Sequence, residues 1–129
     1  RQHTNAGAEA FVRYYNDQLS KAWMTPQTGL LPPLSLSTCK SCRAWEKSAE
    51  LFNVENTRMR GVVFAIEDVS VWEESINGFV VRMAGPQNAN SIVDDSGRVI
   101  KDVSASPGHL YFSLVWVDGQ WKVEEIQAG

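Results

Sequence analysis

Apolar side chains recur every three or four residues through the first part of the chain, between Asn5 and Met24. They are Ala8, Phe11, Val12, Tyr15, Leu19, Ala22 and Trp23. This period places them on one face of an amphipathic helix, with polar residues on the other face. Pro26 and Gly29 follow and end the pattern. We therefore predict a long opening helix from Asn5 to Met24.

A second helical pattern begins after a connector rich in proline. The connector, residues 25–38, contains three prolines and four leucines, so it cannot form one helix but can bury apolar side chains around a short turn. In the pattern that follows, Cys42, Trp45, Ala49 and Phe52 share one face. Thr38 precedes this pattern, and we predict that it is the N-cap of the second helix.

From Met59 the apolar period changes to two, and β-branched and aromatic residues dominate, which predicts a sheet. Residues 60–73 form one long strand candidate, but the apolar residues change face along it. Val62 and Ile66 fall on one face of the strand, whereas Val69 falls on the other. A β-bulge near Glu67 and Asp68 would restore the register.

Turn signals divide the rest of this half into antiparallel strands. Turns are predicted at Asn77 and Gly78, at Asp95, Ser96 and Gly97, and at Asp118 and Gly119. The last turn joins two strands whose apolar positions are Leu110, Phe112, Leu114, Trp116, Trp121, Val123 and Ile126. Residues 84–108 are polar and rich in turns, which indicates a projecting excursion between central strands. Helices followed by a meander of strands predict an α+β domain over residues 1–129.

Composition sets limits but does not indicate a function. A chain of 129 residues with 43% hydrophobic content is one ordinary domain, long enough to bury a core without metals. The formal net charge of −3 leaves no basic footprint, which argues against nucleic acid as a partner. No run approaches the roughly 18 apolar residues of a membrane span.

The start of the chain and its two cysteines favour export. The chain opens at Arg1 without an initiator Met or an apolar signal segment, so we expect that an upstream segment was removed by processing or by the choice of fragment. In that context Cys39 and Cys42 fit an exported, oxidised pair better than two cytosolic thiols.

The order of these elements and the ending Gly119-Gln120-Trp121-Lys122-Val123 resemble the nuclear transport factor 2-like, or cystatin-like, cone. The resemblance implies helices packed on a curved antiparallel sheet, a ligand pocket between them in many members, and pairing of two copies through the outer face of the sheet. Ketosteroid isomerase, polyketide cyclases of the SnoaL type and non-catalytic lipoprotein domains share this fold, so fold leaves function open.

Four segments taken in order give a closer resemblance: AEAFVRYYNDQLSKAW, STCKSC, DDSGRVI and DGQWKVEEI. Together they resemble a family of uncharacterised actinobacterial lipoproteins over nearly the whole chain, from Ala6 to Ile126. This resemblance implies a signal peptide, a lipid-attachment cysteine and a spacer before Arg1, with the domain outside the membrane. It supplies no reaction and no catalytic residue.

The Cys39 and Cys42 pair allows three kinds of chemistry. A Cys-x-x-Cys pair at a helix start can support thiol-disulfide exchange, but oxidoreductase motifs follow a strand, whereas Cys39 follows the proline-rich connector. A structural disulfide closing this short loop would contribute about 2 kcal/mol. A zinc site would need His3 and His109 as further ligands, whose spacing is unsuitable. We therefore predict a disulfide, no metal and no cofactor.

General acid or base chemistry in a cone pocket requires an acid or a histidine held in apolar surroundings. The candidates are Asp17, Asp68, Glu74 and His109. Adjacent acids on a strand point to opposite faces and do not converge, and no catalytic triad or glycine-rich phosphate loop is present. Only Asp68, beside the predicted bulge, stands out as a candidate base.

The aromatic residues are the remaining candidates for a binding site. The candidates for lining a ligand pocket are Tyr15, Trp45, Trp72, Phe112 and Trp116, with Asp68 as the acid. Core packing explains the same aromatic residues, because such side chains dominate burial in any compact domain. Exposed aromatic residues would instead serve a protein partner or a homodimer formed through the sheet.

We therefore expect a non-enzymatic, lipid-anchored, extracytoplasmic domain that binds a small apolar ligand or a protein partner at the cell envelope. The alternatives are a small enzyme of the isomerase or cyclase type with Asp68 as its base, and a thiol-disulfide protein that uses Cys39 and Cys42.

Overall fold

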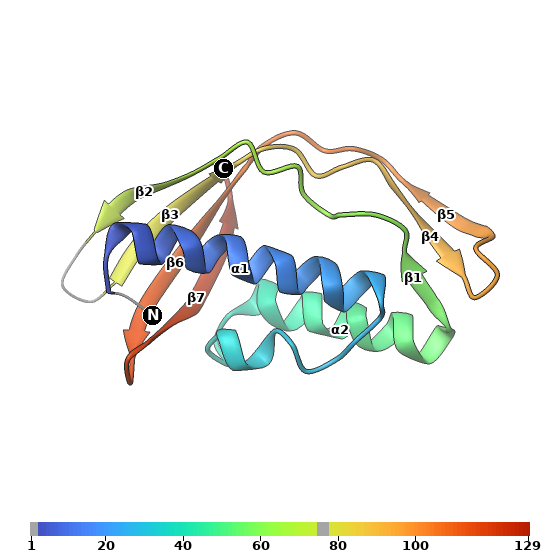
Figure 1. Cartoon of the computed structure of the whole chain (residues 1–129), viewed down its shortest axis with the longest axis horizontal. Helices are drawn as coiled ribbons and strands as arrows, with labels where there is room; N and C mark the ends of the chain where they lie inside the picture. Colours follow the sequence, from blue (N-terminus) through green and yellow to red (C-terminus); the bar gives the residue numbers. More distant parts are fainter. Residues whose placement is uncertain (1–2, 75–77) are drawn as a thin grey trace.

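The computed structural model describes residues 3–74 and 78–129, in which two α-helices lie on one face of a four-stranded antiparallel sheet (Figure 1). The helices are α1 (Asn5–Met24) and α2 (Lys40–Glu55), and the connector between them contains the short 3-10 helix η1 (Pro32–Leu34). The predicted α+β class is confirmed, with the helices before the sheet in the chain.

Two sheets share the second half of the chain. The larger sheet contains, in spatial order, β2 (Asp68–Glu74), β3 (Gly78–Ala84), β6 (His109–Val117) and β7 (Gln120–Ala128). The smaller sheet contains β1 (Thr57–Met59), β4 (Asn90–Asp94) and β5 (Val99–Val103), again in spatial order. The β4-β5 hairpin lies within residues 84–108 and projects away from the larger sheet (Figure 1). It is the excursion that the turn signals predict.

The opening helix has the predicted bounds, because its apolar period and its cap agree. Thr4 caps α1, since its Oγ1 accepts a hydrogen bond of 3.0 Å from the Gly7 amide. All seven predicted apolar residues of α1 are buried. Glu9, on the same helix, accepts a hydrogen bond of 3.3 Å from the Val71 amide of β2, so α1 also covers part of the free edge of that strand.

The predicted N-cap of the second helix is wrong. Thr38 is exposed, and the cap is Cys39, whose Sγ accepts a hydrogen bond of 3.2 Å from the Cys42 amide. The disulfide between these two cysteines explains the difference, because it holds the Cys39 sulfur over the first turn of α2. The sulfur therefore occupies the place that the hydroxyl of an ordinary cap would fill.

The single long strand predicted over residues 60–73 is also wrong. Irregular chain runs from Arg60 to Glu67, because this segment leaves the smaller sheet after β1 and joins the larger one only at β2. The predicted alternation of buried side chains does not hold in this segment, because Val62 is 54% exposed and its neighbour Val63 is only 2% exposed.

The bulge of β2 lies between Val71 and Glu73, and not near Glu67 and Asp68. The extra residue at that bulge is Trp72, since Val71 pairs with Val81 and Glu73 with Val80. Among the predicted turns, that at Asn77 and Gly78 lies partly outside the described residues. The turns before β5 and β7 are confirmed.

Candidate functional site

Three of the predicted ligand residues meet where the helices face the sheet. The ring centroid of Tyr15, on α1, lies 6.2 Å from that of Trp45 on α2 and 5.9 Å from that of Phe112 on β6. Phe64, from the irregular segment before β2, extends this row and lies 6.1 Å from Trp45. Nothing in the sequence pattern singled out Phe64, because it belonged there to the long predicted strand.

Trp45 and Phe64 line a cleft of about 230 Å³ at the end of the larger sheet where β6 begins and β7 ends. Leu110 adds apolar surface, Gln87 and Ser106 add polar residues, and His109 also lines the cleft; these six residues define the Trp45 cleft. Apolar walls with a few polar groups are typical of small-molecule sites.

Backbone pairing fixes the far wall of the Trp45 cleft. Gln87 and Ser106 exchange two backbone hydrogen bonds of 2.8 and 3.0 Å, and Gln87 also forms a β-bridge with Phe64. Gly85 is required beside them, because its φ is +137° and a Cβ atom would lie 2.0 Å from the Ala65 carbonyl oxygen. The strand excursion thus contributes a fixed wall to the cleft.

Tyr15 places a polar atom in the core behind Trp45. The residue is 0% exposed, and its hydroxyl has no hydrogen-bond partner in residues 3–74 and 78–129. Burial raises the pKa of Tyr15 well above its usual range, and the charge of Glu46 raises it further. The phenol therefore stays neutral at physiological pH.

Phe112 is fully buried beneath Tyr15. It packs in the core and does not line the Trp45 cleft.

Trp72 lies on the outer face of the larger sheet and not at the cleft. As the extra residue of the bulge it is 65% exposed, and its ring centroid lies 5.0 Å from that of Tyr111. On the same face, the Arg82 guanidinium lies 3.0 Å from Nε2 of His109. The prediction that Trp72 lines a pocket between helix and sheet is therefore wrong.

Trp116 lies near the opposite end of β6 from the cleft. His3 stacks on it with a centroid distance of 4.6 Å and an interplanar angle of 9°, while Trp121 meets it edge-on at 5.0 Å. Trp116 therefore belongs to a packed aromatic cluster and not to the Trp45 cleft. No periodic signal could have found the contact with His3, because that residue precedes α1.

Asp68 begins β2 and is exposed. It lacks the apolar surroundings that a general base in a cone pocket requires.

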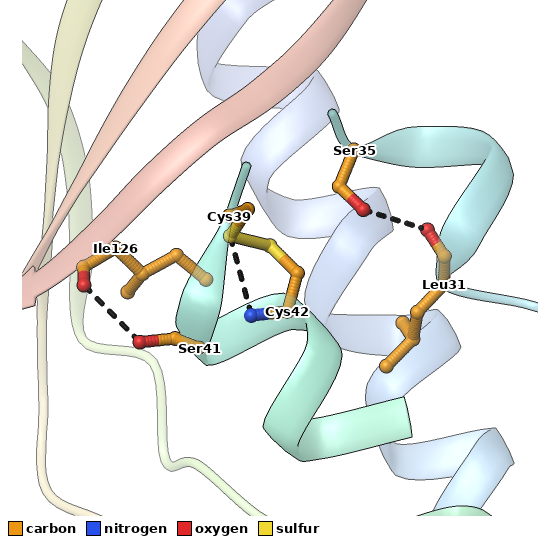
Figure 2. Close-up of a disulfide and its surroundings, with 6 residues drawn as sticks. All are labelled: Leu31, Ser35, Cys39, Ser41, Cys42 and Ile126. Atoms are coloured by element: carbon orange, nitrogen blue, oxygen red, sulfur yellow. Dashed lines mark hydrogen bonds between the residues drawn. A yellow bond between two sulfur atoms is a disulfide. The ribbon is translucent and has the colours of Figure 1, made fainter. Parts of the chain in front are cut away.

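The predicted disulfide is confirmed. Cys39 and Cys42 are joined by an S–S bond of 2.05 Å, and they are only 0% and 2% exposed. Figure 2 shows the bond across the start of α2, where Ser41 Oγ donates a hydrogen bond of 3.2 Å to the Ile126 carbonyl of β7. The pair therefore fastens the end of the connector to the helix and, through Ser41, to the sheet.

Neither a metal site nor a membrane-spanning helix is found in the described residues. They contain no group of three or more His, Cys, Asp and Glu side chains placed to hold a metal ion. None of the described helices is both long enough and apolar enough to span a bilayer.

Comparison with known proteins shows the fold. No family model and no curated protein sequence matches the chain. Among solved structures, the intermembrane space region of the chloroplast protein ARC6 is similar, with a TM-score of 0.73 at 14% identity over 99% of this chain and 98% of that one. Aln2 from a Streptomyces species has a TM-score of 0.57 at 11% identity, over 95% of this chain and 87% of its own.

A protein of unknown function from Nostoc punctiforme, described as having a cystatin-like fold, has a TM-score of 0.52 at 6% identity, over 92% of this chain and 87% of its own. At these identities the likeness concerns the fold alone. Two helices on an antiparallel sheet, in this order, give the domain the cystatin-like fold described for that protein.

Proposed function

We propose that this chain is a non-enzymatic domain that binds a small apolar ligand in the Trp45 cleft. The observation that carries the proposal is the pair of aromatic rings, Trp45 and Phe64, that lines a cleft of about 230 Å³. Pockets for drug-sized molecules measure about 300–1,000 Å³, so the ligand is smaller or only partly enclosed. Gln87 and Ser106 would orient its polar groups.

The proposal places the domain outside the cytoplasm, in a lipoprotein of the cell envelope whose anchor precedes Arg1. The buried disulfide supports this location, because disulfides persist in oxidising compartments. The resemblance of the sequence to actinobacterial lipoproteins is the reason for proposing a lipid anchor. Labelling of the full-length protein in cells with a fatty-acid probe tests this part, and a protein without label would contradict it.

Ligand binding can be tested with N-phenyl-1-naphthylamine, an uncharged apolar dye whose fluorescence rises in apolar sites. We expect saturable enhancement that Trp45→Ala weakens by about tenfold, because the ring carries much of the contact area. Trp72→Ala is the matched control, since Trp72 lies on the outer face, and it should bind the dye like the parent protein. Equal binding by all three proteins would contradict the assignment to this cleft.

The enzymatic alternative has less structural support. Its base, Asp68, is exposed at the start of β2, outside the apolar surroundings that a general base in a cone pocket needs. The thiol-disulfide alternative requires a reagent to reach sulfur atoms that are almost wholly buried. A disulfide that survives mild reductants in the folded protein would argue against it.

A second copy of this chain is a further candidate partner, because Trp72 and Tyr111 form an aromatic pair on the outer face of the larger sheet. A homodimer through this face would bury Trp72. Sedimentation equilibrium tests the idea: we expect Trp72→Glu to shift the protein to monomer. A parent protein that is monomeric at all concentrations would contradict it.

A further inference from the structure

The side of α2 that faces solvent carries a stripe of basic and aliphatic side chains. Their positions are three or four residues apart, which places them within an arc of about 100° around the helix axis. We call them the α2 stripe: Lys40, Arg43, Ala44, Lys47, Leu51 and Val54. All of them are exposed, whereas the opposite side of the helix enters the core.

The three cations of the α2 stripe have no partner within residues 3–74 and 78–129. Their side chains form neither an ion pair nor a hydrogen bond there. The acids Glu50 and Glu55 flank the stripe but do not lie between its members. The whole chain has a formal net charge of −3, so the chain without these three cations would carry −6. The stripe is therefore a basic surface on an otherwise acidic domain.

Two aliphatic side chains end the stripe near the C-terminus of α2. Leu51 is 49% exposed and Val54 is 75% exposed, and their spacing of three residues places them side by side on the helix. A single exposed aliphatic residue is ordinary, but here two of them continue a row of cations. Such a combination on one helix face is typical of helices that lie on anionic membranes.

We propose that the α2 stripe binds the surface of an anionic phospholipid bilayer, with the axis of α2 parallel to that surface. The three cations pair with headgroup phosphates, and Leu51 and Val54 enter the headgroup region. Figure 1 shows α2 along the border of the molecule opposite β2 and β3, in agreement with the exposure of the stripe.

A bilayer fits the stripe better than a protein partner does. Headgroup phosphates move laterally, so they can pair with cations that no contact holds in place, whereas protein interfaces bury well-packed anchors at their centre. The inference also rests on the envelope location proposed above, which puts a bilayer within reach. A single acyl chain binds a membrane only marginally, and a basic patch is one of the second contacts that make the binding stable.

Co-sedimentation of the domain with lipid vesicles tests the proposal. At low ionic strength we expect binding to vesicles of phosphatidylglycerol and phosphatidylcholine in equal parts. Binding to pure phosphatidylcholine, or to the anionic vesicles at high ionic strength, should be at least about tenfold weaker, because salt screens exposed charges. Equal binding to both kinds of vesicle, or no binding to the anionic ones, would overturn the proposal.

A triple variant assigns the contact to the stripe. Lys40→Gln, Arg43→Gln and Lys47→Gln together remove its charges and keep good helix formers. One Lys or Arg near an anionic surface strengthens binding by about fivefold, so we expect the partition into anionic vesicles to fall by about 100-fold. Circular dichroism checks that the variant is folded.

The matched control removes three exposed cations that lie elsewhere, on α1 and β5. Arg13→Gln, Lys21→Gln and Lys101→Gln together give the same net charge as the first variant but leave the α2 stripe intact. This protein should keep most of its binding to anionic vesicles. Equal losses in the two variants would show that net charge, and not the stripe, determines binding, and would overturn the assignment.

The aliphatic part of the stripe is tested with Leu51→Ser and Val54→Ser together, which should weaken binding to anionic vesicles by about tenfold. Poly-L-glutamate serves as a soluble polyanion without a bilayer. If it binds as tightly as the vesicles do, the stripe serves an acidic protein and the proposal is wrong. None of these variants touches the Trp45 cleft, so dye binding there and acyl labelling of the full-length protein report separately on the proposed function.

Discussion

Tyr15 combines a ring that is packed in the core with a buried polar atom that has no partner among the described residues. Its ring packs between Trp45 and Phe112, as the helical period predicts for a core position. Its hydroxyl, however, is buried without a hydrogen-bond partner in the described part of the chain. Such a group reduces stability, because it gives up its hydrogen bonds to water on folding and receives none in return.

Replacing Tyr15 with Phe should therefore raise the free energy of unfolding by about 1 kcal/mol at pH 7. The pKa of Tyr15 is raised in the folded state, so above the unfolded pKa of about 10 the unfolded chain ionises first and the protein loses further stability as the pH rises. Urea denaturation at pH 7 and at about pH 10.5 measures both effects. Above pH 10 the parent protein should lose more stability than Tyr15→Phe does. A variant that is markedly less stable at pH 7 would show that the hydroxyl is hydrogen-bonded.

At the scale of elements, the start of α2 combines a covalent link with a cap. Cys39 supplies both, since its sulfur forms the disulfide and also accepts the hydrogen bond from the Cys42 amide. The sequence pattern predicted the disulfide but assigned the cap to Thr38, because capping preferences describe hydroxyls and carboxylates and not sulfur. The two contributions can be separated by substitution.

The variant Cys39→Ser with Cys42→Ala removes the disulfide and keeps a capping oxygen, whereas Cys39→Ala with Cys42→Ala removes both. We expect the first to lower the free energy of unfolding by about 2 kcal/mol and the second by about 1 kcal/mol more. Thermal and urea denaturation provide the measurement. Equal stability of the two variants would show that position 39 contributes no cap.

The β4-β5 hairpin offers a pH-dependent test at the same scale. Asp94 accepts hydrogen bonds from the Ser96 hydroxyl at 2.7 Å and from the Arg98 amide at 2.9 Å, and these contacts hold its pKa below the usual 3.8. The carboxylate therefore supports the turn above pH 3.8 and loses this role as the pH falls through its lower folded value.

We expect the amide resonances of Ser96 and Arg98 to stay constant from neutral pH down to about pH 4 and to move together only below it. An NMR titration checks this, with Asp94→Asn as the variant in which the transition disappears. A transition midpoint above 3.8 would contradict the hydrogen-bond assignment.

At the scale of the whole molecule, the sequence predicted the parts with a regular period and missed the segment that joins the two sheets. The opening helix and the final hairpin have clear periods and turns, and both are confirmed. Residues 60–67 have an apolar pattern typical of a strand, but tertiary pairing places them between sheets, with Phe64 bridged to Gln87. A local sequence pattern cannot predict such a crossing, because the crossing depends on contacts between residues that are distant in sequence.

The candidate site was predictable only in part for the same reason. Tyr15, Trp45 and Phe112 lie on apolar stripes that face a common interior, and their rings lie close together there, but only Trp45 lines the cleft. Trp72 was misplaced, although Val71 pairs with the buried Val81 and strand alternation then directs the next residue to the outer face.

The central claim is that a small apolar ligand binds at Trp45, and the indole N–H resonances of the tryptophans test it most directly. In a titration of ¹⁵N-labelled protein with N-phenyl-1-naphthylamine, we expect saturable shifts at the Trp45 indole and at the amides of Gly85 and Leu110. The indoles of Trp72 and Trp116 should not move, because both lie away from the cleft. Shifts confined to Trp72, or no saturable shift at Trp45, would contradict the account.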